Sequence, residues 1–206
     1  MNSLQVILVD AGTGNLHSVY NALQSLGAEV NLTDDPAVVR GGGRIILPGV
    51  GAFGHFMTGL HRRGLDDALA EIFMRGEPLL GICVGMQAFF QSSEEMGMHP
   101  GLGFLQGRVL RFSDQPDLKV PHTGWNQLWP QKPSKLLNDL PAGSYAYFNH
   151  AYYCAPSTSE DVLALTDYGL KYASMVQRQN LFGVQFHPEK SQSIGLRILE
   201  NFVRYC

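Results

Sequence analysis

Cys83 lies at the centre of the segment of this chain that is best suited to chemistry. It stands within Gly81-Ile-Cys-Val-Gly85, directly after the apolar pair Leu79-Leu80. A small-x-nucleophile-x-small spacing after a strand predicts a nucleophile elbow, a turn so tight that only glycine lets the neighbouring backbone pass. We expect a helix after the turn, whose positive N-terminal end favours thiolate over thiol. A buried, inert cysteine is the alternative, but the two flanking glycines favour a nucleophile.

A thiolate nucleophile needs a base, and His187 is the candidate. It follows the apolar segment Phe182-Gly-Val-Gln-Phe186, which we interpret as a buried strand, and Glu189 comes two residues later. In extended backbone, residues i and i+2 point the same way, so Glu189 would reach one ring nitrogen while the other faces the sulfur. A surface histidine beside a carboxylate is the alternative. The preceding apolar strand favours a site, because α/β proteins place their sites at strand ends.

An acyl-transfer site also needs donors for a developing oxyanion. The backbone N–H of Val84, which follows the nucleophile, is the first candidate. Val50 is the second, since the short apolar strand predicted at Ile45–Leu47 ends in Pro48-Gly-Val-Gly51. Removing one such donor typically costs about 2.7–4 kcal/mol of transition-state stabilisation. An ordinary glycine turn after the strand is an equally good interpretation of this segment.

The composition is that of one globular domain. The chain has 206 residues, 45% hydrophobic and 16% charged, which is enough for one sizeable core, and we expect a single domain over residues 1–206. A net charge of −3 without runs of Lys or Arg argues against nucleic acid and membrane surfaces as partners. We expect no secretory signal and no membrane span. Three widely spaced cysteines without CxxC indicate free thiols in the cytoplasm and no metal site.

Strand and helix patterns alternate along the first half of the chain. We expect strands at Leu4–Val9, Glu29–Leu32 and Ile45–Leu47, and helices at Leu16–Leu26 and about Phe56–Arg75. Such alternation predicts an α/β fold with a mostly parallel central sheet and helices on both faces. From Gly103 to about Ala173, short segments rich in Gly, Pro and aromatics predict an antiparallel extension. A last helix begins at about Gln192 and buries Ile194, Ile198, Leu199 and Phe202.

One further glycine turn invites a cofactor interpretation. Gly12-x-Gly14 follows the first strand, but His17 occupies the third glycine position of a dinucleotide loop and no acidic residue suits the ribose. No Gly-Lys-Ser/Thr sequence of a Walker loop occurs. We therefore expect no nucleotide and no other cofactor.

These motifs together resemble the class I, triad-type glutamine amidotransferases. Gly81-Ile-Cys-Val-Gly-Met-Gln87 and Phe186-His-Pro-Glu-Lys-Ser191 carry the family likeness. Four elements are similar, more narrowly, to the glutaminase subunits of imidazole glycerol phosphate synthase: Asn15-Leu-His-Ser-Val19, Leu47-Pro-Gly-Val-Gly-Ala-Phe53, Pro121-His-Thr-Gly-Trp-Asn126 and Gly183–Gln192. The likeness runs from about Val6 to Phe202, and its motifs keep the same order.

The resemblance implies that glutamine is the substrate. Cys83 would attack its side-chain amide, His187 would transfer protons, and Glu189 would hold the imidazolium. Gln87 would recognise the amino-acid end. Gly49, Gly51 and the turn Asn149-His-Ala-Tyr152 would line the pocket, largely through backbone. The chain departs from the family at Asn149, where Val is usual, and at Ala151, where Ser is usual, and both changes are tolerable if the contacts are backbone ones.

The resemblance also implies a partner, a (β/α)8-barrel cyclase subunit that uses the ammonia in histidine biosynthesis. The expected interface residues are Asn15, Trp125, Asn126, Tyr147, Tyr152 and Lys190. Exposed aromatics suit interfaces, although buried Trp and Tyr are commoner. Asn15 is equally well explained as a helix cap.

Other functions use the same triad. A glutaminase subunit could feed a different synthase, such as a sugar amidotransfer system, and only partner-facing segments would distinguish it. A stand-alone γ-glutamyl hydrolase would turn over substrate without a partner. A non-enzymatic regulatory module usually lacks a triad member, whereas Cys83, His187 and Glu189 are all present.

Overall fold

One long sheet runs through the molecule in the order β2-β1-β3-β4-β13-β12-β10-β7-β5-β6. The computed structural model describes residues 4–114 and 118–206. Five strands at one end of the sheet pair in parallel, as predicted. They are β1 (Gln5–Val9), β2 (Glu29–Thr33), β3 (Arg44–Gly49), β4 (Leu79–Cys83) and β13 (Leu181–Val184). All residues of β4 and β13 are buried, which is typical of parallel strands covered on both faces.

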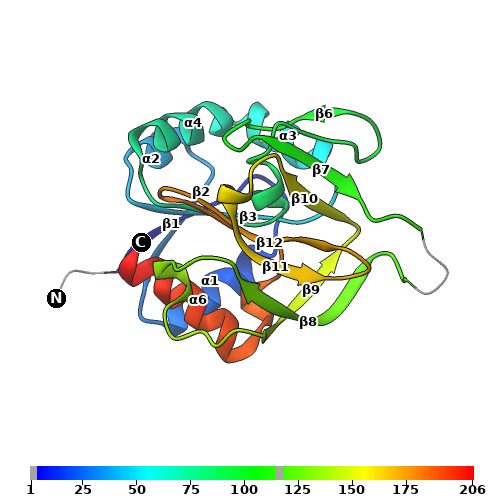
Figure 1. Cartoon of the computed structure of the whole chain (residues 1–206). Helices are drawn as coiled ribbons and strands as arrows, with labels where there is room; N and C mark the ends of the chain where they lie inside the picture. The colour runs from blue at the N-terminus through cyan, green and yellow to red at the C-terminus, as the bar shows by residue number, and fades with distance from the viewer. Residues whose placement is uncertain (1–3, 115–117) are drawn as a thin grey trace.

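Helices cover both faces of the parallel strands, as predicted (Figure 1). The helices α1 (Leu16–Ser25) and α6 (Gln192–Tyr205) lie on one side. The helices α2 (Pro36–Arg40), α3 (Phe53–Arg62) and α4 (Leu65–Arg75) lie on the other. The sequence predicted one helical stretch over about Phe56–Arg75, and this is wrong in detail, because the chain breaks at Gly64, where φ is 64°. The short α2 was not predicted, although Asp35 caps it by accepting from the N–H of Ala37 at 2.8 Å.

The antiparallel extension predicted between Gly103 and Ala173 is confirmed. Its strands are β7 (Gly107–Arg111), β8 (His122–Pro130), β9 (Ser144–His150), β10 (Tyr152–Pro156), β11 (Val162–Asp167) and β12 (Lys171–Arg178). Strand β12 pairs antiparallel with β13 and joins the extension to the parallel strands. The hairpin β8–β9 attaches through β11. Short elements complete the chain: β5 (Ser92–Ser93), β6 (His99–Pro100), α5 (Val84–Gln87), η1 (Lys135–Leu137), η2 (Ser159–Asp161) and η3 (Pro188–Lys190).

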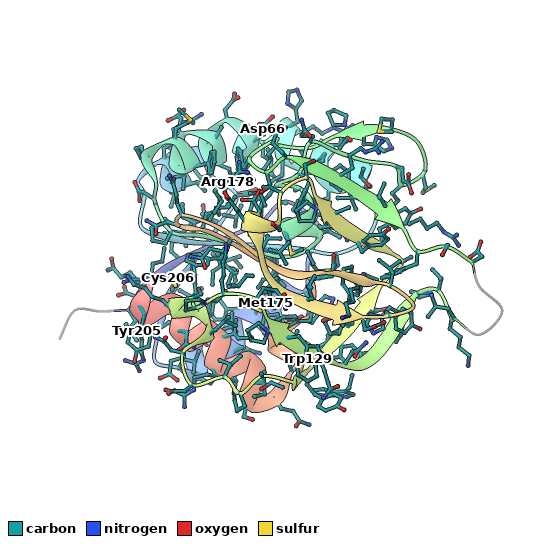
Figure 2. All side chains as sticks on the ribbon, in the orientation of Figure 1. Asp66, Trp129, Met175, Arg178, Tyr205 and Cys206 are labelled. Atoms are coloured by element: carbon teal, nitrogen blue, oxygen red, sulfur yellow. The ribbon has the colours of Figure 1, made fainter. Side chains whose placement is uncertain are left out.

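The hydrophobic core lies between the sheet and its helices. Ile198, Leu199 and Phe202 of α6 are fully buried, as predicted, whereas Ile194 is only partly buried and packs against the core. Burying one such side chain contributes about 1.5–3 kcal/mol. Figure 2 places Met175 in the interior and Trp129 at the outside, where it is about half exposed. Within residues 4–114 and 118–206, the structure contains no helix with the length and hydropathy of a membrane span.

Candidate active site

The turn at Cys83 has the geometry of a nucleophile elbow. Cys83 ends β4 with φ of 56°, a left-handed conformation that is uncommon for a non-glycine residue. A Cβ on Gly85 would lie 1.9 Å from the carbonyl oxygen of Leu47, and one on Gly81 would lie 2.7 Å from the carbonyl oxygen of Gly85. Both positions therefore require glycine, which is the physical basis of the spacing.

The helix expected after the elbow is a single turn. The helix α5 covers only Val84–Gln87. The next carbonyl groups, of Ala88, Phe89 and Phe90, accept from backbone N–H groups of the segment 102–105 at 2.7 to 3.1 Å. Because these carbonyls are bound by a neighbouring segment, the helix does not continue.

Parallel pairing brings the candidate residues to one edge of the sheet. Gly49 at the end of β3 lies opposite Cys83, and Ile82 lies opposite Val184 of β13. The segments that follow these three neighbouring strands therefore meet where the strands end. Val50 and His187 come from these segments, and Cys83 is the last residue of β4.

The three predicted catalytic side chains lie together. His187 Nδ1 is 2.9 Å from Glu189 Oε1, and the two side chains are 5% and 1% exposed. Burial alone would lower the pKa of His187, but hydrogen bonds with Cys83 and Glu189 and their charges raise it to about 10. The imidazole is thus protonated near neutral pH and faces the sulfur on one side and a carboxylate on the other.

The backbone at His187 differs from the expectation. Residues Pro188–Lys190 form the 3-10 turn η3 and are not extended, so Glu189 reaches the ring through a turn. The backbone N–H of His187 donates to the carbonyl of Tyr147 at 2.9 Å. Ser191 Oγ donates to the carbonyl of His187 at 2.6 Å and accepts from the N–H of Tyr147 at 2.9 Å. Strand β9 therefore positions the histidine.

Asn15 is part of this site and does not act as a side-chain cap. It occupies the N-cap position of α1, but its side chain makes no capping hydrogen bond. Its Nδ2 instead donates to Glu189 Oε1 at 3.2 Å, the oxygen that also contacts His187. The capping alternative is therefore wrong. Within the described part of the chain, the buried Glu189 Oε2 has no hydrogen-bond partner.

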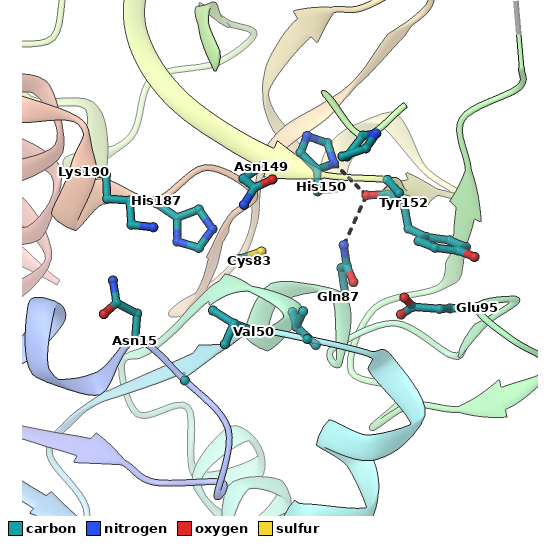
Figure 3. A pocket seen from close by; sticks show the side chains of 15 residues that line it. Asn15, Val50, Cys83, Gln87, Glu95, Asn149, His150, Tyr152, His187 and Lys190 are labelled. Atoms are coloured by element: carbon teal, nitrogen blue, oxygen red, sulfur yellow. Dashed lines mark hydrogen bonds between the residues drawn. The ribbon is translucent and has the colours of Figure 1, made fainter. Parts of the chain in front are cut away.

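A cavity of about 550 Å³ opens in front of Cys83 (Figure 3). Most of the residues that the sequence predicted for the oxyanion donors and the glutamine pocket line it: Val50, Gly51, Val84, Gln87, Asn149, Ala151 and Tyr152. Gly49 does not line the cavity, contrary to the prediction. It is buried under the elbow, where a Cβ would lie 2.6 Å from Phe56 and 2.8 Å from the backbone nitrogen of Gly85.

Gln87 and Glu95 present acceptors to this cavity. Gln87 Nε2 donates to the carbonyl of Tyr152 and to Gln185 Oε1, both at 3.2 Å, which leaves its carbonyl oxygen for a ligand. Glu95 lines the same wall, and one of its oxygens accepts from the N–H of Phe53 at 2.7 Å. Sequence reasoning missed Glu95 because it lies in an irregular hairpin turn without a motif. It also missed Gln185, whose Nε2 lies 3.7 Å from Cys83 Sγ.

A buried histidine pair supports the wall of the cavity. His150 Nδ1 donates to the carbonyl of Tyr152 at 2.7 Å, and its Nε2 lies 3.3 Å from His122 Nδ1. Burial lowers the pKa of His122 to about 4 and that of His150 to about 3, so both rings are neutral at neutral pH. Asn126 faces this pair: its Nδ2 donates to the carbonyl of Asp167 at 2.9 Å and lies 3.3 Å from His122. Its side chain is thus held by hydrogen bonds within the protein, and its role in binding a partner stays a prediction.

The other predicted interface residues gather beside the cavity. Trp125 is 46% exposed and packs edge-to-face on Tyr147, with ring centroids 6.0 Å apart. Lys190 Nζ lies 5.9 Å from the centroid of the same Tyr147 ring. Both Lys190 and Asn15 line the cavity. Their role in binding a partner stays a prediction. Within residues 4–114 and 118–206, no cluster of His, Cys, Asp or Glu is suited to hold a metal ion.

A Cys-His-Glu set at the carboxyl ends of parallel strands, behind a nucleophile elbow, defines a class of α/β proteins built for acyl transfer. The family model "Glutamine amidotransferase class-I" matches residues 7–206. The chain belongs to this family.

Curated relatives show which members of this family the chain is similar to. The chain is 50% identical over 200 residues to "Imidazole glycerol phosphate synthase subunit HisH" of Symbiobacterium thermophilum, covering 97% of this chain and 93% of that protein. It is 46% identical to the protein of the same name from Salinibacter ruber, covering 95% and 92%.

Solved structures share the fold at low identity. The structure of PurLQS from Thermotoga maritima matches with a TM-score of 0.75 at 19% identity and covers 100% of this chain and 99% of that one. A structure titled as a glutamine amidotransferase matches with a TM-score of 0.73 at 21% identity, covering 95% and 98%. These likenesses confirm the predicted fold class.

Proposed function

We propose that this chain is the glutaminase subunit of an imidazole glycerol phosphate synthase, acting in histidine biosynthesis in the cytoplasm. The contact among Cys83, His187 and Glu189 at the cavity carries the proposal. The names of the relatives support this acceptor system over another synthase or a stand-alone hydrolase. The intact triad argues against a non-enzymatic module.

The geometry supports a two-step hydrolysis. The Cys83 sulfur attacks the side-chain carbonyl carbon of glutamine and forms a tetrahedral oxyanion. Protonated His187 then gives its proton to the amide nitrogen, ammonia leaves, and a γ-glutamyl thioester remains. The neutral ring next takes a proton from water as the water oxygen attacks the thioester carbonyl carbon, the carbon–sulfur bond breaks, and glutamate leaves while the Cys83 thiolate and the His187 imidazolium are restored. Glu189 stabilises the imidazolium before ammonia leaves and again after the ring takes a proton from water.

The cavity wall supports recognition of the amino-acid end of glutamine. An α-ammonium group donates three hydrogen bonds, and the side-chain oxygens of Gln87 and Glu95 are acceptors on one wall. We assign them to that group. We assign the backbone N–H groups of Val50 and Val84, which flank Cys83 in the cavity, to the oxyanion.

The two family departures fit this pocket. The carbonyl of Ala151 already accepts from the N–H of Phe112 at 3.0 Å, and Asn149 Oδ1 accepts from Thr123 Oγ1 at 3.1 Å. Both oxygens are thus engaged in hydrogen bonds within the protein, and the proposed binding of glutamine uses neither of them. Substitution at either position is therefore compatible with glutamine binding through Gln87 and Glu95.

A partner is needed because ammonia released into water at neutral pH becomes ammonium, which is not a nucleophile. We propose that a (β/α)8-barrel cyclase binds over Trp125, Tyr147 and Lys190, at the rim of the cavity. The carbonyl of Tyr147 holds the backbone N–H of His187, so a partner at this rim would touch the strand that positions the base. For this reason we expect the isolated subunit to be nearly inactive as a glutaminase.

Cys83→Ala tests the proposal in the assembled synthase. We expect loss of glutamine-dependent synthesis and intact ammonia-dependent synthesis, because only the ammonia source is removed. Loss of both would mean that Cys83 holds the structure together. High glutamine turnover by the unpartnered wild-type chain would favour a stand-alone hydrolase instead.

A further inference from the structure

We infer that Gln185 is a second hydrogen-bond donor to the nucleophile, holding the Cys83 sulfur as thiolate together with His187. The inference rests on the proposed function and deepens it. Gln185 Nε2 lies 3.7 Å from Cys83 Sγ, within reach of an N–H···S hydrogen bond. Gln185 is fully buried and Cys83 is 4% exposed, so little water competes for the sulfur.

The orientation of the Gln185 amide follows from its neighbours. Gln87 Nε2 is 3.2 Å from the carbonyl oxygen of Tyr152, which can only accept, so this atom of Gln87 is the nitrogen. The same nitrogen is 3.2 Å from the side chain of Gln185, which must therefore present its oxygen there. The remaining Gln185 group, which faces Cys83, is the NH₂.

A chain of hydrogen bonds fixes this orientation. His150 also donates to the carbonyl of Tyr152, so this oxygen accepts two hydrogen bonds, one from His150 and one from Gln87. The backbone N–H of Gln185 donates to the carbonyl of Ser174 at 2.9 Å, which holds the residue where β13 ends. A rotated amide would place the Gln185 oxygen against the sulfur and two NH₂ groups against each other.

A neutral donor has a specific use beside an imidazolium. His187 gives up its proton when ammonia leaves and regains one from water, so its charge beside the sulfur changes during the cycle. Gln185 stabilises sulfur charge without having a proton to transfer. It therefore favours the thiolate before attack and again when the thioester is hydrolysed and sulfur departs.

The test is the pH dependence of Cys83 alkylation by iodoacetamide, followed by peptide-resolved mass spectrometry in the full chain. Gln185→Glu keeps the side-chain shape but places a carboxylate beside the sulfur, and we expect the pH midpoint of alkylation to rise by about one to two units. Gln185→Met removes the donor without adding charge, and we expect a rise of about half to one unit.

Controls separate this effect from folding and from the proposed function. Gln106→Glu makes the same change at an exposed position just before β7 and should leave the midpoint unchanged, as should the Cys206 peptide in every sample. The thermal transition of each variant reports whether it folds. If one of the two Gln185 variants does not fold, the other variant provides the test. An unchanged midpoint in a folded Gln185 variant would overturn the inference. Alkylation needs neither glutamine nor partner, so its outcome is independent of the Cys83→Ala result.

Discussion

Replacing His150 with glutamine should make stability less sensitive to acid, because this ring is buried in its neutral form. Its pKa is about 3 in the folded chain against an ordinary value of 6.5, so the unfolded chain binds the extra proton first as pH falls. The stability that comes from this difference is present above about pH 6.5 and is lost as pH falls towards the folded value.

The magnitude follows from the two pKa values. Between about pH 7.5 and 5.5 the unfolded ring becomes mostly protonated while the folded ring stays neutral, which costs about 1.4 kcal/mol. His122, whose pKa is about 4 in the folded chain, lowers the free energy of unfolding by a similar amount over the same pH range. His187 has the opposite sign: its raised pKa of about 10 gives stability that is fully present below about pH 6.5 and lost as pH rises towards 10. The pH dependence of wild-type stability therefore combines opposing contributions from these histidines.

The comparison with His150→Gln isolates one histidine. Glutamine can still donate to the carbonyl of Tyr152, so folding should be retained. Urea unfolding of both proteins at about pH 7.5 and 5.5 should show that the wild type loses about 1.4 kcal/mol more than the variant. Equal losses in the two proteins would refute a buried neutral His150. A His17→Gln variant, changed at an exposed histidine, should behave as the wild type.

Three further predictions concern the site. Gly85→Ala forces a Cβ against the carbonyl of Leu47 and should destabilise the chain by about 3 kcal/mol in urea, so an unchanged midpoint would contradict the elbow geometry. Asn15→Leu removes the donor to Glu189 and should lower kcat about tenfold in the assembled enzyme with KM unchanged, whereas unchanged kcat would exclude a positioning role. Glu95→Gln should raise KM for glutamine about tenfold with kcat retained, and an unaltered KM would remove Glu95 from the ammonium site.

The sequence predicts the parts of this site that depend on local spacing. Cys83, flanked by glycines after an apolar strand, and His187 after another strand are found because the tight turn and the strand end constrain nearby residues. The parallel core and the flanking helices also follow, since α1 and α6 have regular apolar periodicity.

Other features depend on contacts between distant segments. Asn126 faces the histidine pair only because of the pairing of β8 with its neighbours, which no local pattern records. Glu95 reaches the cavity from a hairpin turn, and Gln185 meets Cys83 across paired strands. The break at Gly64 was missed because the apolar periodicity continues on both sides of it.

Labelling with a glutamine-mimicking electrophile tests the central claim most directly. The chain, bound to its cyclase partner, would be treated with 6-diazo-5-oxo-L-norleucine and mapped by peptide mass spectrometry. A single adduct on Cys83, prevented by excess glutamine and lost in His187→Ala, is the predicted result. No adduct, or an adduct on Cys154 or Cys206 in place of Cys83, would contradict the assignment of Cys83 as the glutamine-attacking thiol.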